Sequence, residues 1–113
     1  MGQKYTKERN LICRTLSSEE KLDMSPKTIE NIEIYKKDEN TFIVVIEKSK
    51  QIIALGCLNV KMTKKRRIGF IGVIKDIVVY DNNIKLREKL IQYMIVQAIE
   101  KGCYGYAMDE YTD

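Results

Sequence analysis

The sequence contains no histidine and no tryptophan, only one proline, and three cysteines. Zinc sites are usually built from closely spaced Cys or Cys/His pairs, but Cys13, Cys57 and Cys103 stand far apart, so we expect no metal site. Cys57 and Cys103 lie in apolar segments, which favours buried, reduced thiols that act as small apolar side chains. The chain also lacks the run of about 18 apolar residues that a membrane-spanning helix requires, so we expect no membrane partner.

The chain begins without the apolar core of a secretory signal peptide, which predicts a cytoplasmic protein. No repeat, linker or low-complexity segment divides it. Because 44% of the 113 residues are hydrophobic, residues 1–113 are expected to form a single domain with a modest core.

The positive charge is concentrated in the middle of the chain. Residues 61–89 contain nine basic and three acidic side chains, a net charge of +6, whereas the other residues sum to −2 and the whole chain to +4. This distribution predicts one basic face.

The first third of the chain has the signals of helices. Ser17 followed by Glu19 and Glu20 is typical of a helix start, with a capping hydroxyl and acidic residues in the first turn. Ser25 and Pro26 form a second start signal, because proline is favoured at the first helical position. We therefore predict N-terminal helices, the second of which ends near residues 36–38.

Strands are predicted after these helices. Residues 41–46 and 51–58 are β-branched and apolar, a polar turn separates them, and residues 69–80 form a third such run, which together predict an antiparallel meander. Apolar residues then recur every four positions, which predicts one long amphipathic helix: Leu86, Leu90, Met94 and Ala98. Gly102 is expected to end this helix, and residues 104–108 to form a last strand. The expected fold class is α+β with a mixed sheet.

Two segments carry a resemblance to a known family. Residues 72–79 (Gly-Val-Ile-Lys-Asp-Ile-Val-Val) resemble the fourth strand of the GCN5-related N-acetyltransferases (GNAT), and residues 102–109 resemble the fifth. Within that family the pattern is most similar to the glucosamine-6-phosphate N-acetyltransferases. The resemblance covers about residues 42–109 and implies a mixed, mainly antiparallel sheet whose C-terminal strands are truncated.

The resemblance also implies a degenerate cofactor site. Active members of the family hold the diphosphate of coenzyme A with a glycine-rich loop that precedes a helix, whereas residues 79–90 of this chain contain no glycine. We therefore expect no bound cofactor, with Val78, Lys85 and Arg87 as the residual candidates for contacts to coenzyme A.

The catalytic residues that the resemblance implies are incomplete. The sugar-phosphate acetyltransferases carry a Glu-Asp pair on this strand, but here Lys75 replaces the glutamate and only Asp76 remains. Asp76 is either a catalytic carboxylate or a strand-end carboxylate paired with Lys75 or a loop amide. If the chain is active, Asp76 and Tyr111 are its catalytic candidates. Members of the family carry an asparagine and a tyrosine after this strand, and Tyr111 is the candidate substitute for that tyrosine. We predict a non-catalytic chain.

A cluster of cations lies between two of the predicted strands: Lys61, Lys64, Lys65, Arg66 and Arg67. Such a cluster is either a solvated hairpin end or a contact to the phosphates of RNA, with Tyr5, Tyr35 and Tyr80 as candidates for stacking on bases. Our hypothesis is a non-catalytic acetyltransferase-like module that contacts rRNA and neighbouring proteins in a ribosome or a similar RNA–protein particle.

Two alternatives remain open. The first is a minimal active N-acetyltransferase that uses acetyl-CoA on glucosamine 6-phosphate or another small amine. The second is a protein–protein interaction module that pairs through the sheet edge left bare by the truncated strands.

Overall fold

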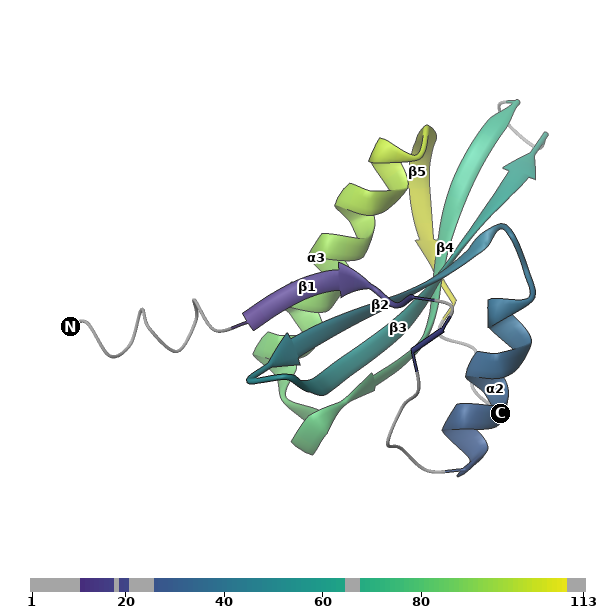
Figure 1. Ribbon diagram of the computed structural model, residues 1–113. Helices are drawn as coiled ribbons and strands as arrows, with labels where there is room; N and C mark the ends of the chain where they lie inside the picture. The colour runs from purple at the N-terminus through teal and green to yellow at the C-terminus, as the bar shows by residue number, and fades with distance from the viewer. Residues whose placement is uncertain (1–10, 18, 21–25, 65–67, 110–113) are drawn as a thin grey trace.

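The computed structural model describes residues 11–17, 19–20, 26–64 and 68–109 (Figure 1). These residues form a five-stranded sheet, two α-helices and one turn of 3-10 helix. In chain order the elements are β1 Leu11–Thr15, α2 Pro26–Lys36, β2 Thr41–Lys48, β3 Gln51–Thr63, β4 Gly69–Val79, η1 Tyr80–Asn82, α3 Ile84–Glu100 and β5 Cys103–Met108.

The sheet has the strand order β1-β2-β3-β4-β5. Neighbours from β1 to β4 are antiparallel, whereas β5 is parallel to β4 because α3 carries the chain back across the sheet. The predicted α+β fold class, with a mixed and mainly antiparallel sheet, is confirmed.

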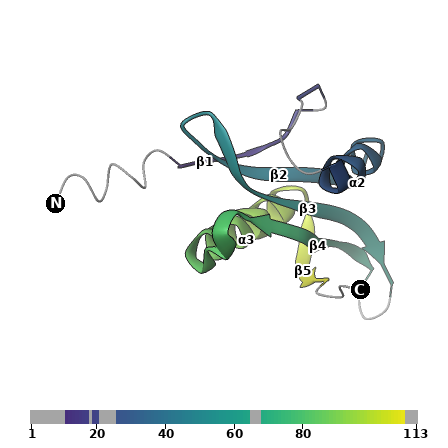
Figure 2. The ribbon, with the colours of Figure 1, turned by 90° about the horizontal axis from the view of Figure 1, so that it is seen from below.

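Helices cover both faces of the sheet, α3 on one side and α2 on the other (Figure 2). Alternate side chains of β2 therefore serve two different cores. Val44 and Ile46 belong to the cluster under α3, whereas Ile43 and Val45 pack with Ile32 of α2. Because these four side chains are all buried, the two helices enclose the middle of the sheet from both sides.

The prediction for the first third of the chain was wrong in one respect, because residues 11–15 form a strand. β1 pairs with β2 from Leu11 opposite Lys48 to Thr15 opposite Val44 and so satisfies backbone groups of a buried strand. The Ser17 hydroxyl accepts the Glu19 N–H at 3.3 Å, as an N-cap does. The rest of that predicted helix lies mostly outside the described residues, and the second predicted helix is confirmed as α2.

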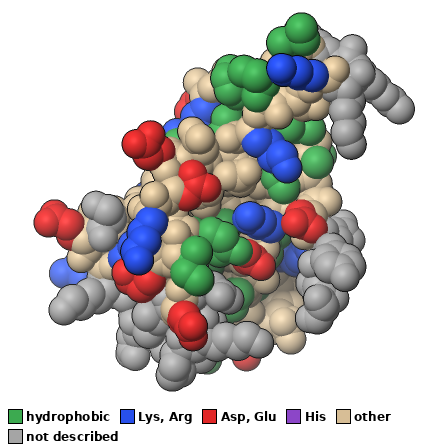
Figure 3. Space-filling view, turned by 90° about the vertical axis from the view of Figure 1, so that its right-hand side faces the viewer, with side chains coloured by type: hydrophobic (Ala, Val, Ile, Leu, Met, Phe, Trp, Pro, Cys, Tyr) green, Lys and Arg blue, Asp and Glu red, His purple; other side chains and the backbone are tan. Residues whose placement is uncertain are grey.

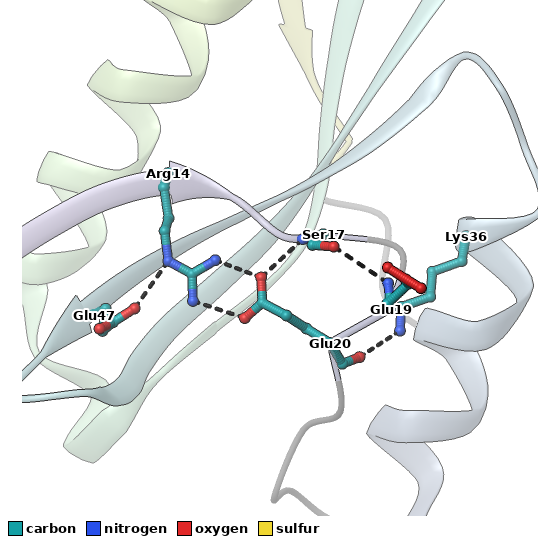
Figure 4. A network of polar contacts seen from close by, with 6 residues as sticks. All are labelled: Arg14, Ser17, Glu19, Glu20, Lys36 and Glu47. Carbon is teal, nitrogen blue, oxygen red and sulfur yellow. Dashed lines mark hydrogen bonds and ion pairs between the residues drawn. The ribbon is translucent and has the colours of Figure 1, made fainter.

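Arg14 of β1 connects three segments of the chain (Figure 4). Its Nη1 and Nη2 donate to the two carboxylate oxygens of Glu20 at 2.6 and 2.8 Å, and its Nε donates to Glu47 of β2 at 2.8 Å. The same Glu20 carboxylate accepts the Ser17 N–H at 2.9 Å, and the Lys36 Nζ donates to the Glu20 carbonyl oxygen at 2.7 Å. The network fixes the start of the chain segment that leads to α2.

The long helix matches its prediction. The side chains spaced four residues apart are its buried ones: Leu86, Leu90, Met94 and Ala98. Gly102 follows the C-cap with a φ of +92°, a conformation that favours glycine. Gly72 of β4 lies directly under the helix, because a Cβ atom there would come within 2.8 Å of the Ala98 Cβ. Cys57 and Cys103 are buried in the two cores, as predicted.

β3 is longer than predicted, and with β4 it forms a hairpin that extends past the helices (Figure 1). The ladder continues to Met62 opposite Phe70 and Thr63 opposite Gly69. Lys61, Met62 and Thr63 are therefore strand residues, whereas Lys65, Arg66 and Arg67 lie outside the described residues. Within the described part of the chain, no helix combines the length and apolar character that crossing a membrane requires.

Candidate functional site

β4 is paired with β5 over only part of its length. The β4–β5 ladder runs from Phe70 opposite Cys103 to Ile74 opposite Met108, and the Asp109 N–H then donates to the Ile74 carbonyl at 2.8 Å. Among the described residues, no strand pairs with residues 75–79 on that side. The exposed backbone edge of β4 ends where α3 begins, so these two elements together frame the candidate site.

The loop between β4 and α3 makes its turn without glycine. Asp81 and Asn82 have φ values of 56° and 50°, in the left-handed region that Asp and Asn tolerate better than other side-chain-bearing residues. Asn83 then caps the helix, because its side-chain oxygen accepts the Leu86 N–H at 3.1 Å. An N–H of the first turn, a group that could bind an anion, is thus used within the protein.

Asp76 lies at a bulge in β4. The ladder with β3 shifts register there, and Asp76 has a φ of 54°. Its carboxylate accepts a hydrogen bond from the Tyr35 hydroxyl of α2. This bond, with partial burial, raises the pKa of Tyr35 well above its usual range, because ionising the phenol would place two negative charges together. Asp76 is thus a strand carboxylate whose hydrogen-bond partner is Tyr35, whereas the sequence suggested Lys75 or a loop amide.

Lys75 and Cys57 complete the surroundings of Asp76. The Lys75 Nζ lies 5.0 Å from the centre of the Tyr35 ring, a cation–π contact. Burial, reinforced by the Asp76 charge, raises the pKa of the Cys57 thiol to about 12. Cys57 is therefore protonated at neutral pH and is a poor nucleophile. The cluster holds Tyr35 between a cation and a carboxylate.

The residual candidates for cofactor contacts lie on β4 and on the start of α3. Val78 is 41% exposed on β4, and Lys85 and Arg87 are exposed on the first turns of α3. A hollow of about 590 Å³ lies beside α3, lined by Leu11, Asn83, Lys85, Leu86, Glu88, Lys89 and Gln92. Of the three candidates only Lys85 lines it, and the lining combines lysines with a glutamate, so the hollow has no strong charge of one sign.

Of the cations predicted to contact RNA, the structure describes Lys61 and Lys64, which lie at the end of the β3–β4 hairpin. Lys61 and Lys64 are exposed there. Sequence reasoning missed the apolar side chains beside them: Met62, Ile68 and Phe70 are 54%, 76% and 43% exposed. Figure 3 shows green hydrophobic and blue basic side chains side by side at this end, at the top of the view. We call Lys61, Met62, Lys64, Ile68 and Phe70 the hairpin-end surface.

The tyrosines proposed for base stacking lie elsewhere. Tyr35 is half-buried and engaged with Asp76 and Lys75. Tyr80 is 66% exposed in η1, far along β4 from the hairpin end. Tyr5 and the catalytic candidate Tyr111 lie outside the described residues.

A hydropathy pattern alone could not have identified Met62 and Phe70 as exposed, since both continue the apolar alternation of their strands.

The fold is shared with known acetyltransferases. Glucosamine-6-phosphate N-acetyltransferase from Arabidopsis thaliana superposes with a TM-score of 0.65 at 19% identity, over 90% of this chain and 83% of that chain. An acetyltransferase of Trypanosoma brucei gives 0.63 at 20% identity, over 89% and 83%. A GNAT family acetyltransferase of Staphylococcus aureus gives 0.73 at 12% identity, over 91% and 88%. No protein-family model and no curated protein sequence matches the chain. The chain has the GNAT fold, as its sequence predicted.

Proposed function

We propose that this chain is a non-catalytic binding module built on the acetyltransferase fold. Its hairpin-end surface contacts RNA, and its host is a ribosome or a comparable RNA–protein particle in the cytoplasm, where neighbouring proteins also contact it.

The observation that supports a non-catalytic chain is the Asn83 cap. The Leu86 N–H, in the first turn of α3, is bound to the Asn83 side chain at 3.1 Å. The preceding loop carries the acidic Asp81, and a carboxylate repels an anionic diphosphate. These residues do not fit the diphosphate of coenzyme A.

The surroundings of Asp76 support the same conclusion. A general base for an amine must have an accessible oxygen and a pKa suited to taking the proton. One oxygen of the Asp76 carboxylate accepts the Tyr35 hydroxyl, and the Lys75 ammonium lies 5.0 Å from the centre of that Tyr35 ring. A cation in these surroundings opposes the approach of a protonated amine.

The charge of the hairpin end supports RNA as the partner. Lys61 and Lys64 are exposed on a hairpin that extends past the helices, and the sequence adds three further cations at residues 65–67. Cations on a protruding element can reach the phosphate backbone of a polyanion and release its counterions.

The test is the salt dependence of RNA binding. We expect replacement of Lys64, Lys65, Arg66 and Arg67 by alanine to weaken binding and to reduce the slope of log affinity against log salt by about one per lost phosphate contact. A matched variant removes four exposed cations elsewhere: Lys37, Lys50, Lys85 and Lys89. Equal slopes for the two variants, or no RNA binding by the unmodified chain, would refute the proposal.

A second candidate function is acetyl transfer to glucosamine 6-phosphate or another small amine. It is favoured by the unpaired edge of β4 at residues 75–79 and by the Asp76 carboxylate at the bulge beside it. Turnover of acetyl-CoA that Asp76→Asn abolishes while the melting temperature is unchanged would establish this candidate instead.

A further inference from the structure

The apolar part of the hairpin-end surface continues one face of the sheet past the helix that covers it. Leu58 and Ile74 are buried in the core under α3, and alternation along β3 and β4 puts Met62 and Phe70 on that same face. The two side chains are directly opposite each other in the ladder. They lie beyond Gly72, over which the last turns of α3 pass, so the helix does not cover them.

A second ring lies on this face. Tyr106 of β5 is the partner of Gly72 in the parallel ladder, and its neighbour Met108 packs into the core under α3. Tyr106 is 48% exposed and Phe70 is 43% exposed. Two partly exposed rings therefore stand on one face of neighbouring strands.

The cations lie around this apolar face. Lys61 pairs with Ile71 and so points to the opposite face of the hairpin, and Lys64 follows the last residue of β3. A ligand that matches the hairpin end must therefore offer both negative charge and a flat apolar surface.

An unpaired nucleic acid strand has that combination, with phosphates along one side and bases free to stack on the other. An RNA duplex presents phosphates and hydroxyl groups while its base faces stay inside, so it would leave Phe70 and Met62 against polar groups.

We infer that the RNA bound at the hairpin end is an unpaired strand, with a base stacked on Phe70 and phosphates beside Lys61 and Lys64. This inference rests on the proposed RNA-binding function and adds the class of RNA that the surface selects. Tyr106 provides the second stacking position.

The experiment measures fluorescence anisotropy of a labelled, unstructured RNA of about 10 nucleotides, and of the same RNA annealed to its complement. We expect the single strand to bind more tightly than the duplex. Phe70→Leu keeps an apolar side chain but removes the ring, and we expect it to weaken single-strand binding by about 5- to 150-fold, the range for loss of one stacked base.

Three variants make the result specific. Phe70→Tyr retains a ring and should restore binding, and Lys61→Gln should weaken binding to either form of RNA. Ile84→Ala removes a residue that is 71% exposed at the start of α3, away from the hairpin, and should have no effect. Thermal melting confirms that each variant is folded.

The outcomes separate the inference from the proposed function. Equal affinity for single strand and duplex, with Phe70→Leu harmless and Lys61→Gln harmful, overturns the inference and leaves RNA binding intact. No binding to either RNA, or binding only to anionic lipid vesicles, overturns both. Tight single-strand binding that Phe70→Tyr preserves and Phe70→Leu weakens supports both.

Discussion

At the scale of single residues, Arg14 joins parts of the chain that are distant in sequence. It bonds to Glu20 and to Glu47, which belongs to the neighbouring strand. The Arg14 side chain, followed by the Ser17 N–H, lowers the pKa of Glu20 from its ordinary 4.5 to about 2. A carboxylate whose pKa is lowered by folding stabilises the folded state above the pKa of the unfolded state.

This linkage predicts a pH-dependent loss of stability. The contribution of Glu20 is fully present above about pH 4.5 and is lost as the pH falls from 4.5 toward 2. Both side chains keep nearly a third of their surface exposed, so solvent screening reduces the contribution to about 1 kcal/mol. Urea unfolding of the wild type and of Glu20→Gln should differ by that amount at neutral pH and converge near pH 2. A difference that stays constant over this range would contradict the assignment.

A second residue-scale prediction concerns the β2–β3 turn. Ser49 and Lys50 form a two-residue turn between Lys48 and Gln51, and both have positive φ, at 51° and 66°. Turns of this kind favour Asn-Gly, because glycine has no Cβ to strain. We expect Ser49→Asn with Lys50→Gly to stabilise the protein by about 1 kcal/mol, or roughly 4–8 °C in melting temperature. Lys50→Ala retains the Cβ and should give no gain.

At the scale of elements, α3 is the main cover of one face of the sheet. Leu90 and Met94 are fully buried, and the helix contacts β2, β3, β4 and β5. The role of this helix is therefore packing, whereas its N-terminus is closed by the Asn83 cap.

Truncation of the buried face should destabilise the whole domain. We expect Leu90→Ala to cost about 2–5 kcal/mol, since it removes buried methyl groups and leaves a cavity. Ile99→Ala on the same helix provides the control, because Ile99 is 61% exposed and its loss should change stability by no more than about 0.5 kcal/mol. Similar effects of the two changes in thermal unfolding would show that the helix does not pack as described.

The elements differed in how far the sequence could predict them. α3 and the strands β2 to β4 were predicted because their apolar residues repeat at the helix or strand period over many positions. β1 is only five residues long and precedes a capping signal at Ser17, so its pattern was too short to separate from a helix. The contact between Tyr35 and Asp76 spans 41 residues and depends on a bulge, which no local pattern encodes.

At the scale of the whole molecule, the chain has the acetyltransferase fold, and its candidate site lies at the end of β4 and the start of α3. β4 is paired with β5 only as far as Ile74. The loop that follows β4 is closed by Asn83, and the strand carboxylate Asp76 is bound to Tyr35 beside Lys75. Exposed cations and apolar side chains gather instead at the far end of the β3–β4 hairpin.

Calorimetric titration of the purified chain with acetyl-CoA tests this account most directly. We predict only heats of dilution, because the capped helix and the Asp81 carboxylate leave no cradle for the diphosphate. A saturable isotherm with a micromolar dissociation constant, weakened by Lys85→Ala or Arg87→Ala, would contradict the account and show that acetyl-CoA binds at the start of α3.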